Sequence, residues 1–443
     1  MVLNLLYLLT LLAASPFLLY RSLRYKKYRD GWGEKFFGAA PQLPPIEPGR
    51  ERIWFHAVSV GEVNLLLPIV AEMDATRQNW EFVVSSTSKT GYELAKKLFA
   101  TRATVFYCPL DFTWAVKRAL RRIAPTALVL VELELWPNLI AAAKRFGVHT
   151  AIVNGRIGDH SFRSYQRIRR FLAPTFRRID LIVAQDEVAA AYFRQLTPSH
   201  KNIVVSGSIK FDGVQTDREN AKTRALAELV GVNSNDVVYL CGSTQAPEEL
   251  GAIETYRRLY REFPNLKLFI APRHKERFDE VAKALAASEF AWTRRSTLPV
   301  PETPVKTQFE NPAQDARRVV LIDSLGELGY WWGIAKIAFV GGSWGNRGGQ
   351  NMLEPSAYGA AVSFGPNTRN FRAIVETLLR EEAAQVVSNV DEATAFVRRC
   401  LVDPAFRETL GKTARQIVVR NSGATKRTLN ELSKLFENIP SYN

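Results

Sequence analysis

The chain has 443 residues, of which 47% are hydrophobic and 23% are charged. A single hydrophobic core rarely grows beyond roughly 250–300 residues, so the length predicts two or more domains. The composition argues against a disordered chain, a collagen-like repeat and a polytopic membrane protein. Lys and Arg total 59 against 44 Asp and Glu, a formal net charge of +15. Such an excess predicts an anionic partner: nucleic acid, anionic lipid or a phosphorylated substrate.

The amino terminus is apolar. Residues 2–20 contain no charged side chain, and as a helix they would extend about 28 Å, close to the hydrocarbon thickness of a bilayer. A cleaved signal peptide carries Lys or Arg before its apolar region, and none precedes this one. Five cations follow it instead, between Arg21 and Arg29. Cleavage near Ala14 is the alternative. The positive-inside rule therefore predicts a single-pass membrane anchor, with the following chain in the cytoplasm.

From Arg52 onward, short runs of β-branched and aromatic residues alternate with segments of helical periodicity. Strands this apolar, separated by helix-length segments, predict parallel sheets that are buried on both faces. The simplest arrangement is two consecutive doubly wound α/β domains. The expected strands are Ile53–Ala57, Phe82–Ser85, Thr104–Tyr107, Ala127–Val131, Thr150–Val153, Leu181–Ala184 and Ile203–Val205, then Val237–Cys241, Lys267–Ala271, Val319–Ile322, Ile337–Val340, Ala361–Phe364 and Val386–Val387.

Two polar segments interrupt this pattern. The boundary between the domains is expected near residues 211–235, where a charged helix over Gln215–Leu229 ends. Residues 296–316 are rich in proline and predict an exposed loop inside the second domain. The expected organisation is an anchor at 2–20, an N-terminal domain at 21–220, a C-terminal domain at 221–425 and a tail at 426–443.

Several enzyme motifs are missing. The segment Gly341–Gly345 matches the G-x-S-x-G nucleophile elbow, but all five histidines precede it, whereas an α/β-hydrolase needs its His afterwards. The chain has no dinucleotide-binding fingerprint and no P-loop. It has no Asp-x-Asp pair, and its three cysteines have no metal or redox spacing. These absences predict a reaction that needs no metal.

In open α/β sheets, ligands bind beyond the carboxyl ends of the strands. Three loops of the first domain carry charged residues at such ends. Glu62 follows the first strand, where it has a catalytic role or merely complements the dipole of the next helix. Glu132 and Glu134 follow the fourth strand, and their alternate spacing predicts that both point to the same side, unless they pair with an arginine such as Arg156. Lys210 follows the last strand and is either a site residue or a surface lysine.

Three loops of the second domain suit a phosphate. Gly242–Thr244 precedes a helix with Pro247 at its start, an arrangement that favours an anion. Arg273 also follows a strand, and its guanidinium matches phosphate geometry. The Gly-rich segment Gly348–Glu354 opens a helix whose backbone N–H groups could hold a phosphate, while Glu354 could accept hydrogen bonds from a ribose. Together these loops predict a nucleotide site.

These segments, in this order, resemble the Kdo transferases, which move 3-deoxy-D-manno-oct-2-ulosonic acid (Kdo) from CMP-Kdo to a lipid A precursor in lipopolysaccharide biosynthesis. The resemblance runs from the apolar amino terminus to about residue 425. Its most specific parts are His56–Glu62, Glu132–Asn138, Ser206–Asp212, Pro272–His274 and Phe339–Glu354. It implies a GT-B fold, in which two Rossmann-like doubly wound domains face a cleft.

The resemblance also implies roles for individual residues. Glu62 is similar to the catalytic general base of the family, and Glu132 and Lys210 lie where the family stabilises the transition state. Gln350 and Met352 stand where the family often has His and Pro, so a role for His at position 350 does not apply. The residues implied in CMP binding are Pro272, Arg273, Leu325, Gly326, Glu327, Asn351, Met352, Leu353 and Glu354.

We therefore interpret the sequence as an inverting, metal-independent glycosyltransferase with CMP-Kdo as donor, and with no cofactor. Its expected partners are a phosphorylated lipid A precursor such as lipid IVA and the anionic lipids of the inner membrane. One alternative is another GT-B enzyme that uses a nucleotide diphosphate sugar. The other is a nucleic-acid-binding protein, which the charge permits but no recognised motif supports.

Overall fold

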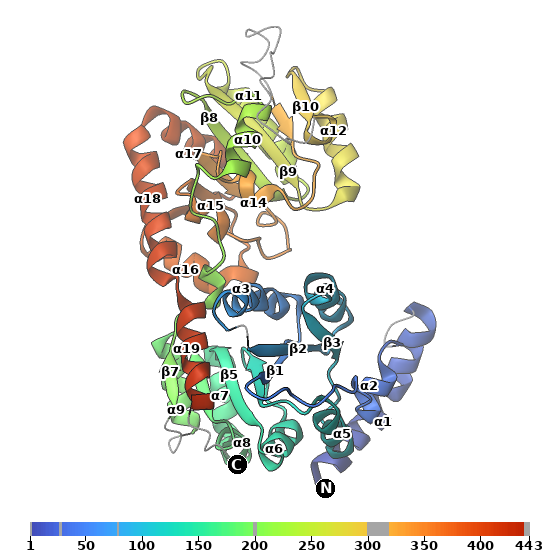
Figure 1. The fold of residues 1–443 in the computed structure, drawn as a ribbon. Helices are drawn as coiled ribbons and strands as arrows, with labels where there is room; N and C mark the ends of the chain where they lie inside the picture. The colour runs from blue at the N-terminus through green and yellow to red at the C-terminus, as the bar shows by residue number, and fades with distance from the viewer. Residues whose placement is uncertain (1, 26–28, 78, 198–201, 299–318, 438–443) are drawn as a thin grey trace. The chain divides into compact units, whose positions relative to one another are not determined.

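The computed structural model describes residues 2–25, 29–77, 79–197, 202–298 and 319–437 (Figure 1). The chain divides into two compact units. The N-terminal unit comprises Met1–Gly213 and Asn421–Asn443, and the C-terminal unit comprises Val214–Arg420. The division after Gly213 lies within the range 211–235 in which the boundary was expected, seven residues before the expected domain limit at 220. Most of the expected proline-rich loop, residues 299–316, lies outside the described residues.

The N-terminal unit is built on a parallel sheet of seven strands in the order β3-β2-β1-β4-β5-β6-β7. The strands are β1 Glu51–His56, β2 Trp80–Ser86, β3 Ala103–Tyr107, β4 Ala127–Val131, β5 His149–Gly155, β6 Leu181–Ala184 and β7 Ile203–Val205. The helices are α1 Val2–Tyr25, α2 Trp32–Phe37, α3 Val60–Thr76, α4 Lys89–Phe99, α5 Thr113–Ile123, α6 Pro137–Arg145, α7 Asp159–Arg167, α8 Arg169–Phe176, α9 Glu187–Leu196, the 3-10 turn η1 Ile209–Phe211 and α19 Ala424–Glu437.

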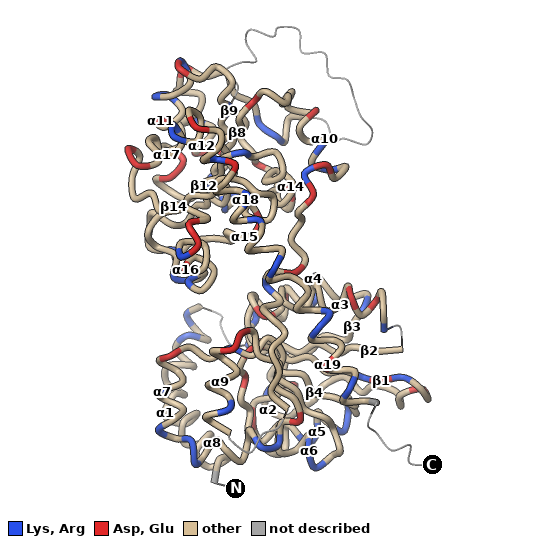
Figure 2. The backbone as a smooth tube through the Cα atoms, turned by 90° about the vertical axis from the view of Figure 1, so that its left-hand side faces the viewer, with Lys and Arg blue, Asp and Glu red and all other residues tan. Residues whose placement is uncertain are grey.

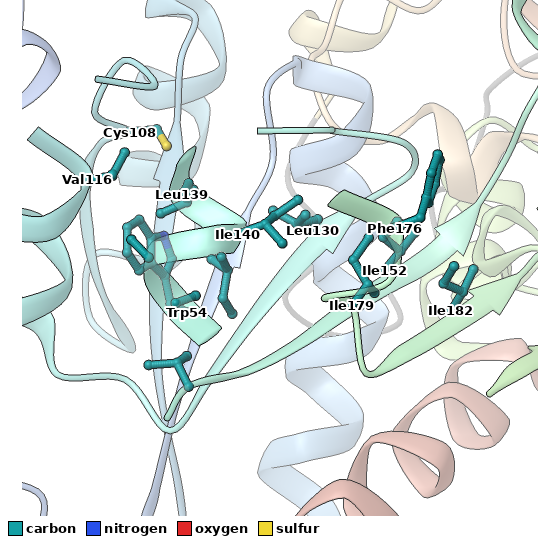
Figure 3. Packing of buried hydrophobic residues seen from close by; sticks show 14 of the residues in the cluster. Trp54, Cys108, Val116, Leu130, Leu139, Ile140, Ile152, Phe176, Ile179 and Ile182 are labelled. Atoms are coloured by element: carbon teal, nitrogen blue, oxygen red, sulfur yellow. The ribbon is translucent and has the colours of Figure 1, made fainter. Parts of the chain in front are cut away.

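Both faces of this sheet are buried, as the apolar strands predict. Successive side chains of a strand point to opposite faces, so Ile53 packs with α3 and α4, whereas Trp54 packs with α5 and α6. Figure 3 shows part of the second face, where Leu139 and Ile140 of α6 lie beside Trp54 and Leu130 of the sheet. Two apolar layers therefore enclose the sheet and fix the positions of its strand ends.

Strand order determines where a ligand site can form. The chain builds outward from β1 to β3 and then returns to add β4 on the other side of β1. The segments after β1 and β4 therefore lead to helices on opposite faces of the sheet, and in open α/β sheets this is the position at which a ligand crevice forms. Glu62 lies in the first turn of the helix that follows β1, and Glu132 lies directly after β4.

The carboxyl-terminal segment is not a tail over its described part. Helix α19 returns to the N-terminal unit, where Leu429 and Leu432 are buried in the core layer of α3 and α4. The carboxylate of Asp212 accepts hydrogen bonds from the N–H groups of Gly423 (2.6 Å) and Thr425 (2.5 Å). The chain thus enters and leaves the C-terminal unit at neighbouring points, and the expected tail was wrong because apolar residues of α19 complete this core.

The C-terminal unit contains a second parallel sheet of seven strands in the order β10-β11-β9-β8-β12-β13-β14. Its strands are β8 Val237–Thr244, β9 Leu266–Pro272, β10 Trp292–Arg294, β11 Val319–Leu321, β12 Ile337–Val340, β13 Ala361–Phe364 and β14 Ala384–Val386. Its helices are α10 Ala221–Leu229, α11 Glu248–Leu259, α12 Phe278–Ala286, α14 Leu328–Trp331, α15 Leu353–Ala357, α16 Arg372–Arg380, α17 Val390–Val402 and α18 Pro404–Asn421, with 3-10 turns η2 Lys275–Arg277, η3 Arg295–Thr297 and η4 Arg369–Phe371.

The linker into this unit is attached by one arginine. The guanidinium of Arg218 donates hydrogen bonds to the carbonyl oxygens of Tyr358 (2.7 Å), Gly333 (2.8 Å) and Ala335 (2.8 Å). The expected helix over Gln215–Leu229 begins only at Ala221, where the Asn220 side chain accepts a hydrogen bond from the Thr223 N–H. Residues before this cap are therefore linker.

Helix α1 satisfies the length and hydropathy of a membrane-spanning segment over Leu3–Tyr25. Its large side chains are mostly exposed, among them Leu5, Leu12 and Leu19. A signal sequence would meet the same criteria, so the helix is consistent with a membrane anchor but does not by itself establish one.

Candidate active site

Glu62 lies in the first turn of α3, directly after β1. Ser59 caps this helix, and the Glu62 N–H donates to its Oγ (3.4 Å). The Glu62 carboxylate turns back and accepts hydrogen bonds from Ser59 Oγ (2.7 Å) and from the Val58 N–H (2.8 Å). This reciprocal arrangement is a capping box, which holds both the loop and the carboxylate in place.

The surroundings of Glu62 favour its protonated form. The side chain is 8% exposed, and burial raises the pKa of this carboxyl above its ordinary value; the negative charge of Glu132 raises it further. The hydrogen bonds from Ser59 and Val58 act in the opposite direction. A raised pKa makes the ionised carboxylate a stronger proton acceptor, which is the property that a general base needs.

Glu132 and Lys210 form an ion pair. Strand β4 ends at Val131, and Glu132 has a φ of 59°, a left-handed conformation that non-glycine residues rarely adopt. Its carboxylate lies 2.9 Å from the ammonium of Lys210 on η1. The Asn154 side chain positions η1 by accepting a hydrogen bond from the Ile209 N–H (3.0 Å). Glu132 therefore pairs with a lysine 78 residues away rather than with Arg156.

Glu134 is a third acid of this site, and we did not assign it a role from the sequence. Its carboxylate accepts a hydrogen bond from the Trp136 indole N–H (3.1 Å). Burial and then the negative charges of Glu62 and Glu132 raise the pKa of Glu134 to about 7. The three carboxylates thus influence one another electrostatically, as expected for groups in one crevice.

A buried histidine, His56, packs against the residues of this site. His56 ends β1, is fully buried, and its Nδ1 lies 2.9 Å from Ser85 Oγ. Its ring packs edge-on against Trp136 at 5.6 Å. Burial lowers the pKa of His56 to about 4, so the ring is neutral at physiological pH. We infer that His56 positions the tryptophan that bonds Glu134.

In the C-terminal unit, one buried carboxylate organises the loops after β8 and β12. Glu248 begins α11 and is 1% exposed. One carboxylate oxygen accepts hydrogen bonds from the Gln245 (2.8 Å) and Gly342 (2.7 Å) N–H groups, and the other from those of Ser343 (2.8 Å) and Trp344 (2.9 Å). These four backbone N–H groups are therefore bound to Glu248, and the carboxylate holds the two loops together.

The two loops pack so closely that only glycine fits at position 341. A Cβ at Gly341 would lie 2.8 Å from a carboxylate oxygen of Glu248 and 2.6 Å from the Cα of Thr244. Any larger residue would push the loops apart. The G-x-S-x-G pattern thus has a structural cause, since Ser343 is fully buried and donates a hydrogen bond to the Val340 carbonyl oxygen.

Arg273 and Glu354, which are both expected to bind CMP, lie close enough to interact electrostatically. Arg273 follows β9 and is exposed, and its N–H donates to the Thr244 carbonyl oxygen (3.0 Å). Glu354, in α15, accepts a hydrogen bond from the Asn351 amide (3.1 Å). Burial raises the pKa of Glu354, while the positive charge of Arg273 lowers it. The ends of β9 and β12 therefore bring these charges to one place.

The other expected CMP contacts differ in what they present. Pro272, Met352 and Leu353 are buried, so their side chains pack in the unit and only backbone atoms remain to meet a ligand. Leu325 is 61% exposed, and Gly326 has a φ of 87°.

Glu327 is already paired in the structure. Its carboxylate receives two hydrogen bonds from the guanidinium of Arg295, at 2.9 and 3.0 Å, and one from the Ser324 hydroxyl. These hydrogen bonds hold Glu327 in its loop, and its role in CMP binding stays a prediction.

A cavity of about 310 Å³ opens at the same sheet edge, and sequence reasoning did not identify most of its residues. Its basic wall consists of His274, Arg277 and Arg347, and Gly342 and Gln245 line it from the loops that Glu248 holds. Arg277 also pairs with Glu249 and Glu280. The cavity is suited to an anionic ligand.

Metal binding has no evident donor set in the part of the chain that the structure describes. Within those residues, no group of three or more His, Cys, Asp or Glu side chains is arranged to hold a metal ion. Metal independence of the reaction stays a prediction, as does every role assigned to a site residue.

Comparison with known proteins gives a consistent result. A family model described as 3-Deoxy-D-manno-octulosonic-acid transferase (kdotransferase) matches residues 30–213. A 3-deoxy-D-manno-octulosonic acid transferase from Haemophilus influenzae is 32% identical over 419 residues, which cover 94% of each chain. An enzyme of the same name from Bordetella pertussis is 30% identical over 440 residues, covering 96% of this chain and 98% of that one.

Solved structures agree on the fold. A glycosyltransferase from Rickettsia africae covers 88% of this chain and 100% of its own, with a TM-score of 0.52 and 12% identity. At that identity the likeness concerns the fold alone. Together with the two parallel seven-stranded sheets, it confirms the predicted GT-B class.

Proposed function

Since the chain belongs to the 3-deoxy-D-manno-octulosonic acid transferase family and is therefore a glycosyltransferase, we propose that it transfers Kdo from CMP-Kdo to a phosphorylated lipid A precursor such as lipid IVA. The observation that carries this proposal is the group of three coupled carboxylates at the β1/β4 crevice. The reaction would invert the anomeric carbon in a single displacement, without a metal.

A sugar hydroxyl is a poor nucleophile at neutral pH, so its attack on the anomeric carbon needs a base. We assign this role to Glu62. Its capping box fixes the carboxylate in place, and burial raises its pKa. When Glu62 takes the proton, the neighbouring acids Glu132 and Glu134 favour the neutral product, because one negative charge in the crevice is removed.

Lys210 and Glu132 would act on charge that develops during transfer. Their ion pair places a cation at the edge of the acidic crevice, where it can stabilise negative charge on an approaching substrate. In the C-terminal unit, Arg273 and Glu354 would hold the phosphate and the ribose of CMP. The cavity beside His274 and Arg347 offers further cations for the anionic groups of the donor.

The acceptor is anionic and carries acyl chains, and the surface of the N-terminal unit suits such a ligand. Phe171 is 83% exposed and Ile168 is 45% exposed, and they lie among the exposed cations Arg167, Arg169 and Arg170. An apolar patch surrounded by arginines is suited to the headgroup region of an anionic bilayer. We propose that this patch and α1 hold the enzyme at the cytoplasmic face of the inner membrane.

The positive charge does not favour nucleic acid. In the view of Figure 2, Lys and Arg are interspersed with Asp and Glu over both units instead of forming one stripe. Several arginines have local acidic partners, as Arg257 and Arg258 do with Glu254. The proposed phosphorylated substrate and the proposed membrane surface are anionic partners that would account for the basic composition.

The test is the variant Glu62→Gln, which keeps the shape of the side chain and removes the basic oxygen. We expect the rate of Kdo transfer to fall about 10²–10⁴-fold, with CMP affinity unchanged. The rate is measured by mass spectrometry of the lipid product. Glu93→Gln on α4, whose side chain is 60% exposed, is the matched control. If Glu62→Gln turns over at nearly the normal rate, the assignment is wrong and Glu132→Gln is the next variant to measure.

A further inference from the structure

A cavity of about 330 Å³ lies within the N-terminal unit, between α1 and the loop that carries Glu134. Leu11 and Tyr7 of α1 form one wall. Leu110 and Phe112, which follow β3, form a second, and Leu135 and Trp136, which follow β4, form a third. We call this cavity the α1 slot. Its walls are mainly apolar, and one of them belongs to the helix with membrane-like hydropathy.

Specific hydrogen bonds attach α1 to the unit at one end of this slot. The Asn4 amide donates to Thr113 Oγ1 (2.6 Å) and accepts from the Asn138 amide (3.2 Å). The Tyr7 hydroxyl donates to the Asp111 carboxylate (3.1 Å). A helix that served only as a tether would need no such contacts, so α1 is a structural wall of the unit.

Asp111 is central to this attachment. It also accepts hydrogen bonds from the N–H groups of Asn138 (2.9 Å) and Leu139 (2.8 Å), at the start of α6. One carboxylate therefore joins α1 to the loop that follows Glu134 and Trp136. The polar atoms around the slot are thus largely paired with one another, which leaves an apolar surface for a ligand.

The opposite face of α1 is apolar and exposed. Leu6, Leu9 and Leu12 have exposed fractions of 57%, 55% and 71%, whereas Asn4, Tyr7 and Leu11 are half-buried. This spacing places the leucines on the side away from the unit, where a bilayer would contact them. Glu134 lines the slot, and the negative charge of Glu62 contributes to its raised pKa. The slot therefore lies between the exposed apolar face of α1 and the acidic crevice.

We propose that the α1 slot binds one acyl chain of the lipid acceptor and so presents the acceptor sugar to Glu62; this inference rests on the proposed function. A sugar that approaches a base above the membrane must lift its acyl chains partly out of the bilayer, which exposes apolar surface to water. The slot replaces those lost contacts with an apolar wall. A hydrocarbon chain is the ligand that such a lining and such a position favour.

The kinetic test compares two positions on the same helix. Leu11→Trp fills the slot, and Leu12→Trp places the same side chain on the exposed face as a matched control. Each enzyme receives CMP-Kdo with either the acylated phosphorylated disaccharide or its fully deacylated form. We expect Leu11→Trp to lower the ratio of kcat/KM for the acylated over the deacylated acceptor at least tenfold, and Leu12→Trp to change it less than twofold. An unchanged ratio in Leu11→Trp overturns the proposal.

A second measurement does not depend on turnover or on the variant. An acceptor with a diazirine near the end of one acyl chain is irradiated with the wild-type enzyme, and the labelled peptides are identified by mass spectrometry. Labelling of the segments around Leu11 and Phe112 supports the slot, whereas labelling elsewhere in the chain overturns it. If the wild-type enzyme transfers Kdo to neither acceptor, the proposed function fails, and the cross-link still decides whether the slot holds the chain.

Discussion

Replacement of Glu248 by Gln should release the loop after β12, because the variant cannot satisfy the same four donors. Each carboxylate oxygen of Glu248 accepts two backbone N–H groups: Gln245 and Gly342 on one side, Ser343 and Trp344 on the other. A glutamine keeps only one acceptor oxygen. In either orientation its amide NH₂ faces two N–H donors, and two hydrogen bonds are lost.

The cost follows from the burial of these groups. A hydrogen bond to a charged group contributes about 1.5–3 kcal/mol, and Glu248 is 1% exposed, so water cannot readily replace the lost bonds. Two lost bonds therefore weaken the loop by about 3–6 kcal/mol. Since about 1.4 kcal/mol corresponds to a factor of ten, the amides of Gly342, Ser343 and Trp344 should exchange with solvent about 10²–10⁴-fold faster.

Hydrogen exchange measured by mass spectrometry on peptides that span residues 340–346 tests this expectation. The matched control is Glu254→Gln on the same helix, where the carboxylate is 34% exposed and pairs with Arg257 and Arg258. Such surface pairs contribute below about 1 kcal/mol, so the control should leave exchange at residues 340–346 unchanged. If Glu248→Gln exchanges within about threefold of the wild type, the carboxylate does not organise the loop.

Two further predictions concern charge. The folded-state pKa of Glu134, about 7, lies above the ordinary value of 4.5, so Glu134 contributes stability below about pH 4.5 that is lost as pH rises through 7. Glu134→Gln lacks this loss, and its melting temperature relative to the wild type should rise between pH 5 and pH 8; a difference that is constant with pH would contradict the raised pKa. Arg273→Ala and Glu354→Ala should each weaken CMP binding about ten- to a hundredfold in calorimetry, whereas Lys275→Ala on the adjacent turn should not. Unchanged affinity in both variants would place the nucleotide elsewhere, and tighter binding of UDP than of CMP would favour a nucleotide diphosphate donor.

The positions of the strands and of the loops that follow them could be predicted from the sequence. Runs such as Ala127–Val131 are apolar at every position, and all five residues are buried in β4. Because the carboxyl ends of parallel strands share one edge, a polar residue directly after such a run marks the site edge without any knowledge of tertiary contacts. Glu62, Glu132 and Lys210 were found in this way.

The limits of the domains were harder to predict because they depend on packing between distant segments. Residues 426–443 were expected to form a tail, yet apolar residues of α19, among them Leu429 and Leu432, are buried in the core of α3 and α4. A short amphipathic helix at the end of a chain carries no information about which unit it joins. In this chain, Asp212 attaches the start of α19 to the N-terminal unit by binding the N–H groups of Gly423 and Thr425.

Partners of the site residues could not be predicted, and the two acids after β4 show why. Period-two alternation predicts that Glu132 and Glu134 are equivalent, but the left-handed φ of Glu132 ends that alternation. Glu132 then reaches Lys210, 78 residues away, while Glu134 turns to Trp136.

The hydrogen-bond partners of Glu248 could not be predicted either, because they are even more distant in the sequence. A Glu at the start of a helix ordinarily complements its own dipole, but here it binds the loop around Gly342, 94 residues away. The sequence therefore predicts which edge of a sheet is polar, since that depends on local pattern. Which charge is free for substrate depends on how distant loops close on one another, and in this protein that closure leaves Glu62 fixed by its own loop while Glu248 is fully used by the fold.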